Sequence, residues 1–336
     1  MPIVSVIVPC YNEEATIRLL LTALSHQTYP RQDMEVIIAD GQSNDGTRHE
    51  IEKFLLDCPG LHVKVVENRK RTIPTGLNCA IAAAEGDYIV RLDAHSVPAP
   101  DYVALSIEAL EKGKGVNVGG VWQIRPAGPG WIARSIAEAA AHPLGVGDAR
   151  YRFTDRAQAV DTVPFGAFHR SLIERIGGFD ESLLTNEDYE FNVRVRQSQG
   201  IVWLDPDIRS TYFARSTLSA LMTQYWRYGF WKARMLKRYP GSLRWRQALP
   251  PLFVLSLIGL ALFSPFLSLA RILLVVEVLT YSLVLWLVST VLAVQRKDPA
   301  LMSGVPAAIA LMHISWGAAF LWSVMENILH KPEVRA

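Results

Sequence analysis

The first part of the chain alternates between short apolar runs and amphipathic stretches with a helical period. The apolar runs predict β-strands at 3–9, 34–39, 62–66, 87–92 and 116–121. The amphipathic stretches predict helices near 13–26, 46–57, 74–85 and 100–112. Short continuous apolar strands separated by helices are typical of a mostly parallel sheet that is covered on both faces. The pattern therefore predicts an α/β domain.

Local signals predict two helix ends within this domain. Asn12, followed by Glu13 and Glu14, is expected to cap the first helix, because an amide cap and early acids suit the positive end of a helix. Gly86 is expected at the C′ position that ends the third helix.

The last part of the chain differs, because its apolar stretches are long enough for membrane spans. Residues 249–294 carry only Arg271 and Glu277 as charges, and 301–325 contains no Asp, Glu, Lys or Arg. Crossing a hydrocarbon core of ~30 Å takes ~20 apolar residues. About three spans are therefore predicted, the first two forming a tight hairpin that bends near Pro265, at 249–269, 272–294 and 303–328. Three crossings would place the C-terminus on the far side of the membrane from the N-terminal domain.

Charge is balanced overall and uneven along the chain. The formal net charge of +2 argues against a nucleic-acid partner. Residues 208–248 hold nine Lys or Arg and no carboxylate, directly before the first predicted span. This basic stretch fits a cytosolic flank under the positive-inside rule, and it also fits a surface for anionic lipid or lipid-linked pyrophosphate. Within the spans, Glu277, His313 and Glu326 are interpreted as contacts between helices or neighbours of lipid headgroups.

Neither the cysteines nor the N-terminus indicates export. Cys10, Cys58 and Cys79 form an odd set without CxxC or zinc-like His spacing, so they are interpreted as reduced structural thiols. The first nine residues look like a buried strand and lack the basic segment and long apolar core of a signal peptide. The N-terminal domain is therefore expected in the cytosol.

Polar clusters follow three of the predicted strands, at the strand ends where α/β sheets bind ligands. They span 9–14, 40–47 and 93–95. The sequence contains neither a GxGxxG fingerprint nor a GxxxxGKS/T phosphate loop, so a nucleotide would be held by other means. Asp93 and His95 offer a carboxylate and an imidazole that suit a divalent ion bridging phosphates. The alternative is a helix cap beside an ordinary loop histidine.

Further segments allow a functional and a structural interpretation. Residues 185–190 open a predicted helix that runs to about Gln197, and its acids supply either a catalytic base or ordinary helix N-terminal charge. Residues 224–228 combine stacking rings with an amide and a guanidinium, or they belong to an interfacial aromatic belt. In 165–168 and 177–180, small and aromatic residues either approach an acceptor sugar or place glycine in turns and phenylalanine in the core.

Taken in this order, the motifs resemble the family 2 glycosyltransferases over roughly residues 3–240. The resemblance is carried by 4–14, 40–47, 68–78, 93–95, 177–180 and Glu187-Asp188. It implies a GT-A nucleotide-sugar-binding domain with a mostly parallel sheet, which transfers a sugar from a nucleotide diphosphate with inversion. The implied domains are 1–215 for the GT-A domain, 216–248 for basic and aromatic interfacial helices, and 249–330 for about three transmembrane helices.

Within that family, local phrases resemble the succinoglycan-biosynthesis ExoA type at 93–95, 145–152, 161–168 and 224–231. This type adds glucose to an oligosaccharide on polyprenyl diphosphate at the inner membrane. The resemblance implies a UDP-sugar donor, best guessed as UDP-glucose, and a polyprenyl-diphosphate-linked saccharide acceptor in exopolysaccharide or cell-surface glycan synthesis. It further implies a bacterial-type inner membrane, a cytoplasmic catalytic domain and contact with membrane lipid. Whether the chain forms a homo-oligomer is left open by the resemblance.

The resemblance also assigns roles to residues of the donor site. Asp40 corresponds to the carboxylate that accepts the uracil N3–H, and Arg71 to a base near the uracil or phosphates. Nucleotide contacts are expected from Pro9, Tyr11, Glu13, Asp40, Arg71 and Asp93. Asp93 and His95 would hold Mn2+ or Mg2+, with His95 standing where the family usually has Asp.

The implied catalytic base is Asp188, with Glu187 beside it shaping the site. Asp188 would remove the acceptor proton on one face while a metal and an arginine stabilise the leaving diphosphate on the other. Acceptor or diphosphate contacts are expected from Gly166, Ala167, Gln224, Arg227 and Tyr228. The last three match a QxxRW motif of processive synthases with Tyr in place of Trp, so processivity is not implied.

The leading hypothesis is thus a membrane-anchored inverting hexosyltransferase. A processive polysaccharide synthase is one alternative, for which three spans are few. A non-catalytic scaffold of an export complex that only binds sugar nucleotide is another, and the intact Glu187-Asp188 pair argues against it. A nucleotidyltransferase is disfavoured because residues 9–13 stand where such enzymes usually place a glycine-rich phosphate loop.

Overall fold

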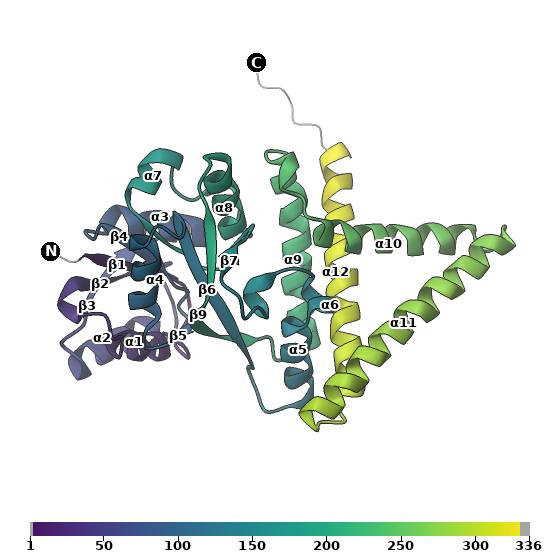
Figure 1. Ribbon diagram of the computed structural model, residues 1–336, viewed down its shortest axis with the longest axis horizontal. Helices are drawn as coiled ribbons and strands as arrows, with labels where there is room; N and C mark the ends of the chain where they lie inside the picture. The colour runs from purple at the N-terminus through teal and green to yellow at the C-terminus, as the bar shows by residue number, and fades with distance from the viewer. Residues whose placement is uncertain (1–2, 330–336) are drawn as a thin grey trace, which may run out of the picture. The chain divides into compact units, whose positions relative to one another are not determined.

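The computed structural model describes residues 3–329, which fall into two compact units. The first unit comprises the chain up to Gln123 together with Ala149–Tyr212. The second comprises Ile124–Asp148 and the chain from Phe213 onward. Figure 1 shows the mixed sheet with its covering helices in the first unit and the long helices α9–α12 in the second.

The sheet of the first unit has the strand order β3-β2-β1-β4-β8-β6-β9-β5, with β7 paired to β9. Its parallel half contains β1 (Val4–Cys10), β2 (Met34–Asp40), β3 (His62–Glu67) and β4 (Tyr88–Arg91). The other half contains β5 (Val97–Pro98), β6 (Asn117–Pro126), β7 (Gln158–Ala159), β8 (Ala167–His169) and β9 (Val202–Ala214). Here β8 pairs antiparallel with β4 and β6, and β9 pairs antiparallel with β5 and β7. All five predicted strands are confirmed.

Helices cover both faces of this sheet, as the apolar strands predict. They are α1 (Ile17–Ser25), α2 (Thr47–Asp57), α3 (Ile73–Ala83), α4 (Tyr102–Glu111), α7 (Ser171–Ile176) and α8 (Glu187–Gln197). Alternate residues of β1 enter two separate cores, because successive side chains of a strand point to opposite faces. Val6 packs with α1, α2 and α4, whereas Ile7 packs with α3 and α8.

Two predicted helix ends are wrong. The first helix begins at Ile17, not near 13, and Asn12 has a φ of +55° in the preceding loop. Asn12 cannot cap the helix because its amide is used across the loop, as described below. The third helix ends at Ala83, and Gly86 lies beyond it without the positive φ of a C′ glycine. A Cβ on Gly86 would lie 2.8 Å from the backbone nitrogen of Ser5, so this glycine permits close packing against β1.

The second unit consists of α5 (Trp131–Ala141), α6 (Pro143–Val146), α9 (Leu218–Leu236), α10 (Trp245–Phe263), α11 (Ser268–Arg296) and α12 (Leu301–Leu329). Short 3-10 turns occur in the chain at Arg31–Asp33, Arg150–Arg152 and Pro240–Ser242. Helices α10, α11 and α12 are each long and apolar enough to cross a membrane. The turn between α10 and α11 contains Pro265, which confirms the predicted hairpin bend.

Candidate active site

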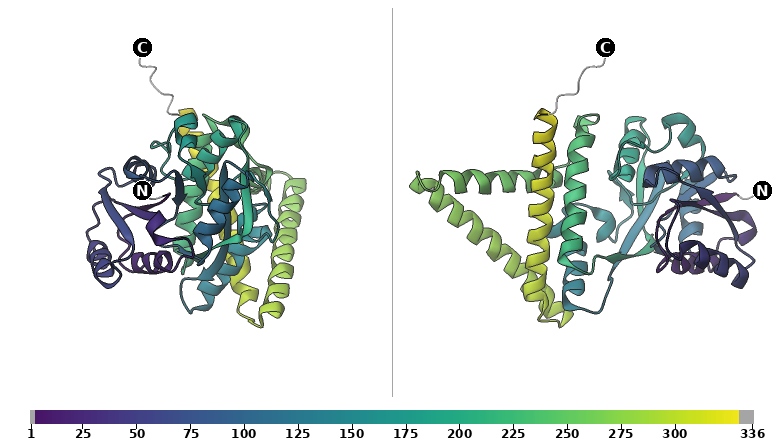
Figure 2. Two further views of the ribbon diagram at one scale, coloured as in Figure 1. Left: turned by 60° about the vertical axis from the view of Figure 1, so that its left-hand side comes forward. Right: turned by 180° about the vertical axis from the view of Figure 1, so that it is seen from behind.

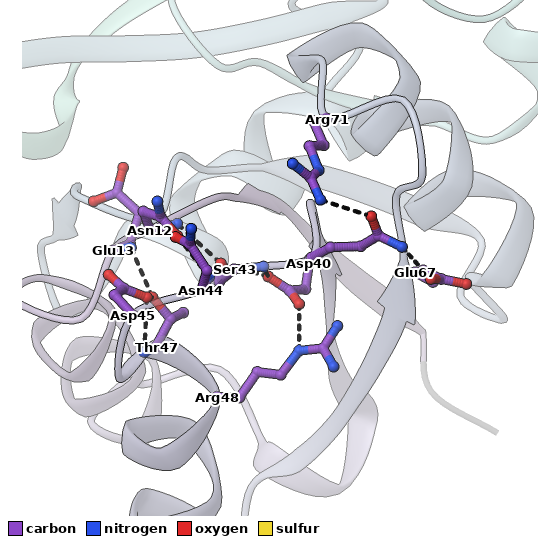
Figure 3. A network of polar contacts seen from close by, with 11 residues as sticks. Asn12, Glu13, Asp40, Ser43, Asn44, Asp45, Thr47, Arg48, Glu67 and Arg71 are labelled. Carbon is purple, nitrogen blue, oxygen red and sulfur yellow. Dashed lines mark hydrogen bonds and ion pairs between the residues drawn. The ribbon is translucent and has the colours of Figure 1, made fainter.

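The loops after β1 and β2 are joined by hydrogen bonds (Figure 3). The backbone N–H of Asn12 donates to Ser43 Oγ at 2.9 Å, and Asn12 Oδ1 accepts from the N–H of Asn44 at 3.0 Å. The N–H of Glu13 donates to Thr47 Oγ1 at 2.7 Å. The two polar clusters predicted at 9–14 and 40–47 therefore form one rigid wall at the carboxyl edge of the sheet.

Tyr11 and Arg71 form an open aromatic and cationic surface at this wall. The Tyr11 side chain is exposed, and the guanidinium of Arg71 lies 5.9 Å from the centre of its ring. Arg71 Nη2 also donates to Gln42 Oε1 at 3.0 Å. A Cβ on Gly41 would lie 3.1 Å from the Tyr11 ring, so a small residue is needed beside it. This arrangement suits stacking against a flat base while a guanidinium approaches a phosphate or carbonyl oxygen.

Asp40 lies fully buried at the end of β2, with both carboxylate oxygens engaged. Oδ1 accepts from the hydroxyl of Ser43 at 2.6 Å, and Oδ2 accepts from Arg48 Nε at 2.5 Å. The backbone N–H of Ser43 also donates to Oδ1, at 3.1 Å, and a carboxylate has about four acceptor positions, so one is left for the predicted contact with a uracil N–H. Arg48 was not among the predicted residues, because in the sequence its position in the first turn of α2 looks like an ordinary exposed helix charge.

Asp93 and His95 follow β4, where the sequence predicts a metal site. Their side chains are partly exposed, and His95 Nδ1 lies 3.2 Å from Glu13 Oε1. Across residues 3–329, no three His, Cys, Asp or Glu side chains are gathered as a metal-binding cluster. The two predicted ligands are therefore accessible to solvent without a third protein ligand among the described residues. A bound diphosphate would have to supply further oxygen ligands to a metal ion.

Arg91 is the buried centre of the site. Its side chain is only 1% exposed, and Nη2 donates to Asp93 Oδ1 at 3.1 Å and to Glu187 Oε1 at 2.9 Å. Nη1 donates to Asp188 Oδ1. Burial would lower the pKa of Arg91, but the carboxylates of Asp93 and Glu187 raise it above its ordinary value. One guanidinium thus joins Asp93, predicted as a metal ligand, to Glu187 and Asp188, predicted as catalytic residues.

Charge at this centre favours a cation. With three ionised carboxylates around one guanidinium, the four side chains carry a net charge of −2. A divalent ion on the open side of Asp93 would offset that charge. The donor set of one carboxylate and one imidazole fits Mn2+ and, with less preference, Mg2+.

Asp188 stands in the first turn of α8, next to the strained entry into β8. Its Oδ2 accepts from the N–H of Phe165 at 3.4 Å, and Phe165 and Gly166 have φ values of +65° and +87°. A Cβ on Gly166 would lie 2.5 Å from Asn117 Oδ1, so glycine is required by both space and backbone angle. The predicted helix at 185–197 and its acidic first turn are confirmed.

The aromatic residues of the segments 165–168 and 177–180 lie in the core, and their glycines lie in turns. Phe168 is fully buried in a tilted pair with Phe191, and Phe179 stacks on Phe191 at 4.7 Å. Ala167 is 1% exposed in β8, with its side chain in the core. Gly177 has a φ of +81° at the end of α7. These positions agree with glycine in turns and phenylalanine in the core, and the acceptor contacts of Gly166 and Ala167 stay a prediction.

The Gln224–Tyr228 motif lies in the second unit, on α9. Gln224 Nε2 donates to Tyr228 Oη at 3.0 Å, one helical turn away, and Tyr228 makes an edge contact with Tyr225. Arg227 is exposed on the same helix. The amide and the phenol are therefore oriented together, with the guanidinium free to reach solvent.

The ionisable residues of the apolar helices have helix contacts. Glu277 accepts from Ser256 of α10, and Glu326 pairs with Arg234 of α9 at 3.1 Å. His313 contacts Tyr281 of α11 and the carbonyl of Leu144, both at 2.9 Å. The contact interpretation is thereby supported. The three cysteines are all free, as predicted.

Comparison with known proteins shows the family and the fold of the chain. The family model described as Glycosyl transferase family 2 matches residues 5–177, just over half of the chain. The chain is 28% identical to the succinoglycan biosynthesis protein ExoA of Rhizobium meliloti (strain 1021), over 94% of this chain and 93% of the relative. It is 27% identical to a dolichyl N-acetyl-alpha-D-glucosaminyl phosphate 3-beta-D-2,3-diacetamido-2,3-dideoxy-beta-D-glucuronosyltransferase of Methanococcus voltae, over 73% and 77% of the two chains.

Among solved structures, the mannosyltransferase PcManGT from Pyrobaculum calidifontis, in complex with GDP-Man and Mn2+, superposes with a TM-score of 0.64 at 23% identity. The match covers 96% of this chain and 87% of that one. The fold is therefore GT-A, with long apolar helices after the catalytic domain. The chain belongs to glycosyltransferase family 2 and is a glycosyltransferase.

Proposed function

We propose that this glycosyltransferase moves a hexose, namely glucose from UDP-glucose, onto a lipid-linked saccharide during exopolysaccharide or cell-surface glycan synthesis. The observation that carries the proposal is the Arg91 centre, which holds a candidate base and a candidate metal ligand on one buried guanidinium. A protein that only binds sugar nucleotide has no need to hold Asp188 in this way.

In the proposed reaction, the wall formed by the loops after β1 and β2 holds the nucleoside. Tyr11 stacks on the base, Asp40 accepts its N–H, and Arg71 approaches the diphosphate. Asp93 and His95 would hold a divalent ion. When bound, that ion neutralises negative charge on the leaving diphosphate.

Asp188 supplies the remaining chemistry. It takes the proton from an acceptor hydroxyl as that oxygen forms a bond to the anomeric carbon and the bond to the diphosphate breaks. One base acting on the face opposite the leaving group gives a single displacement, hence inversion. Glu187 stays hydrogen-bonded to Arg91 and keeps the guanidinium in place.

Two features support a lipid-linked acceptor at a membrane. The second unit has three helices long and apolar enough to cross a bilayer. The relative from Methanococcus voltae is named for a dolichyl-phosphate-linked sugar, which is a lipid-linked acceptor. We place the catalytic domain on the cytoplasmic side of a bacterial-type inner membrane, consistent with its free cysteines.

The test is sugar-nucleotide turnover by the detergent-solubilised full chain, with Mn2+, Mg2+ or EDTA and a polyprenyl-diphosphate-linked saccharide acceptor. UDP-, GDP- and dTDP-sugars are compared, because the superposed mannosyltransferase structure holds GDP-Man. Metal-dependent release of UDP is expected, with one added sugar whose anomeric configuration is opposite to that of the donor, hence a β-linkage from UDP-glucose. A long polymer would indicate the processive alternative, and nucleotide binding without turnover by any donor would contradict the proposal.

A further inference from the structure

Helix α12 differs from the other two long apolar helices in what surrounds it. In its most apolar window, 39% of residues are buried, against 11% for α10 and 11% for α11. Figures 1 and 2 show α12 running beside α9, with α5 near its beginning. The backbones approach closely, because a Cβ on Gly229 of α9 would lie 2.2 Å from the carbonyl oxygen of Trp316. A Cβ on Gly304 of α12 would likewise lie 2.1 Å from Ser135 Oγ of α5.

The helices that cover α12 carry charge, and ion pairs tie them to both of its ends. Near its beginning, Arg134 of α5 pairs with Asp298 at 2.7 Å, and Glu138 of α5 pairs with Arg296 at 2.8 Å. Near its other end, Arg234 of α9 pairs with Glu326. Neither α5 nor α9 is long and apolar enough to cross a membrane within the described part of the chain.

Helices α10 and α11 instead leave most of their apolar side chains exposed. Leu252, Ile258 and Leu262 of α10 and Leu269 and Leu279 of α11 are all more than half exposed. At 1.5 Å per residue, the 19 residues of α10 extend about 28 Å and the 29 residues of α11 about 43 Å. Figure 1 shows α10 leaving α12 at a steep angle and α11 returning on a slant to the beginning of α12. A perpendicular α10 and a tilted α11 therefore span one bilayer thickness.

A perpendicular α12 would be incompatible with these neighbours. Because α12 is packed against α5 and α9 along its length, it would carry them into the hydrocarbon together with exposed Arg227, which lies in the middle of α9. Charged groups in that position are costly. Exposed Trp131, Trp226 and Trp322 on α5, α9 and α12 instead suit the headgroup level, where tryptophan is enriched.

We propose that only α10 and α11 cross the bilayer, and that α12 lies along the membrane surface with α5 and α9. The partner of this surface is the lipid bilayer. The turn at 264–267 reaches the far face, and the C-terminus returns to the side of the catalytic domain. This arrangement replaces the three crossings expected from hydropathy, which would put the C-terminus on the far side.

Cysteine labelling tests the sidedness in the full-length chain. In a Cys58→Ser/Cys79→Ser background that keeps buried Cys10, single cysteines are introduced as Phe266→Cys, Lys297→Cys and Ala336→Cys. Spheroplasts of a bacterial host are treated with a membrane-impermeant maleimide before and after permeabilisation. Labelling of position 266 in intact spheroplasts is expected, with 297 and 336 labelled only after permeabilisation. Labelling of 336 in intact spheroplasts, or protection of 266, would overturn the proposal.

Depth measurement provides a second test that does not depend on a host or on activity. Spin labels at the exposed positions Met302, Ile314 and Met325 of α12 and Leu279 of α11 are compared in lipid nanodiscs by oxygen and nickel accessibility. The three α12 positions are expected at one shallow depth, with Leu279 deeper. An Ile314 label as deep as Leu279, flanked by two shallow α12 labels, would show that α12 crosses.

Discussion

Each end of helix α8 holds an arginine, but in a different way. At its first turn, Arg91 is shared by three carboxylates, and its Nε has no hydrogen-bond partner among the described residues. Near its last turn, Arg194 is held in a two-point contact with the single carboxylate of Glu190, at 2.6 and 2.8 Å. Backbone carbonyls, including that of Ile176 at 2.6 Å, accept its remaining N–H groups.

This difference separates a structural arginine from a functional one. One bidentate carboxylate and a few carbonyls satisfy Arg194, whose side chain is 17% exposed, so holding a guanidinium against α8 does not require more. The two further carboxylates at Arg91 add negative charge, which costs stability. The Nε–H of Arg91, which has no partner among the described residues, adds to that cost. Such an excess is typical of a site that binds a cation or moves a proton. Four predictions test this comparison.

Asp188→Asn is expected to have the largest effect. The amide keeps the shape of the side chain and cannot accept the acceptor proton, so kcat should fall by about 10²–10⁴. Turnover is measured with saturating donor, while nucleotide affinity is measured by calorimetry and should change little. Native turnover in a folded, nucleotide-binding variant would show that Asp188 is not the base.

Arg91→Lys is expected to reduce kcat by roughly 10- to 100-fold, because outer partners of metal ligands typically contribute on that scale. Lysine keeps the positive charge, but its single nitrogen lacks the planar fork with which Arg91 reaches Asp188 through Nη1 and Asp93 through Nη2. The matched control is Arg194→Lys, which makes the same exchange at the other end of α8. Equal activity losses in the two folded variants would erase the distinction between them.

Arg194→Met is expected to act on stability. It leaves the fully buried Glu190 without its two-point partner, which should lower the free energy of unfolding by about 3 kcal/mol. Denaturant unfolding measures this loss, and kcat per folded molecule should be unchanged. A large fall in kcat without loss of stability would place Arg194 in the catalytic machinery.

His95→Asp is expected to have the smallest effect. Replacing imidazole with a second carboxylate favours Mg2+ over Mn2+, because hard oxygen ligands suit Mg2+. The ratio of turnover with the two ions should shift by about tenfold, near the lower edge of what altered metal surroundings produce. An unchanged ratio over a full titration of both ions would exclude His95 as a ligand.

The strands, most helices and the polar clusters could be predicted because their signals are local. The period of apolar residues reports which face of an element is buried, and the order of motifs reports the family. Asn12 and Gly86 were mispredicted for the same reason: their partners, Ser43 and Ser5, lie far away in sequence. A helix-end rule uses only neighbours along the chain.

The sequence by itself determined the α/β pattern, the acidic start of α8 and the length of the apolar helices, since each depends on neighbouring residues. Only the tertiary structure decided that Arg91, the last residue of β4, joins Asp93 to Glu187 and Asp188. These two acids lie 96 and 97 positions after Arg91 in the sequence. Hydropathy likewise reports how apolar α12 is, but not what covers it. Which charges meet a buried group is decided by packing between distant segments, because electrostatic and hydrogen-bond partners are chosen by distance in space.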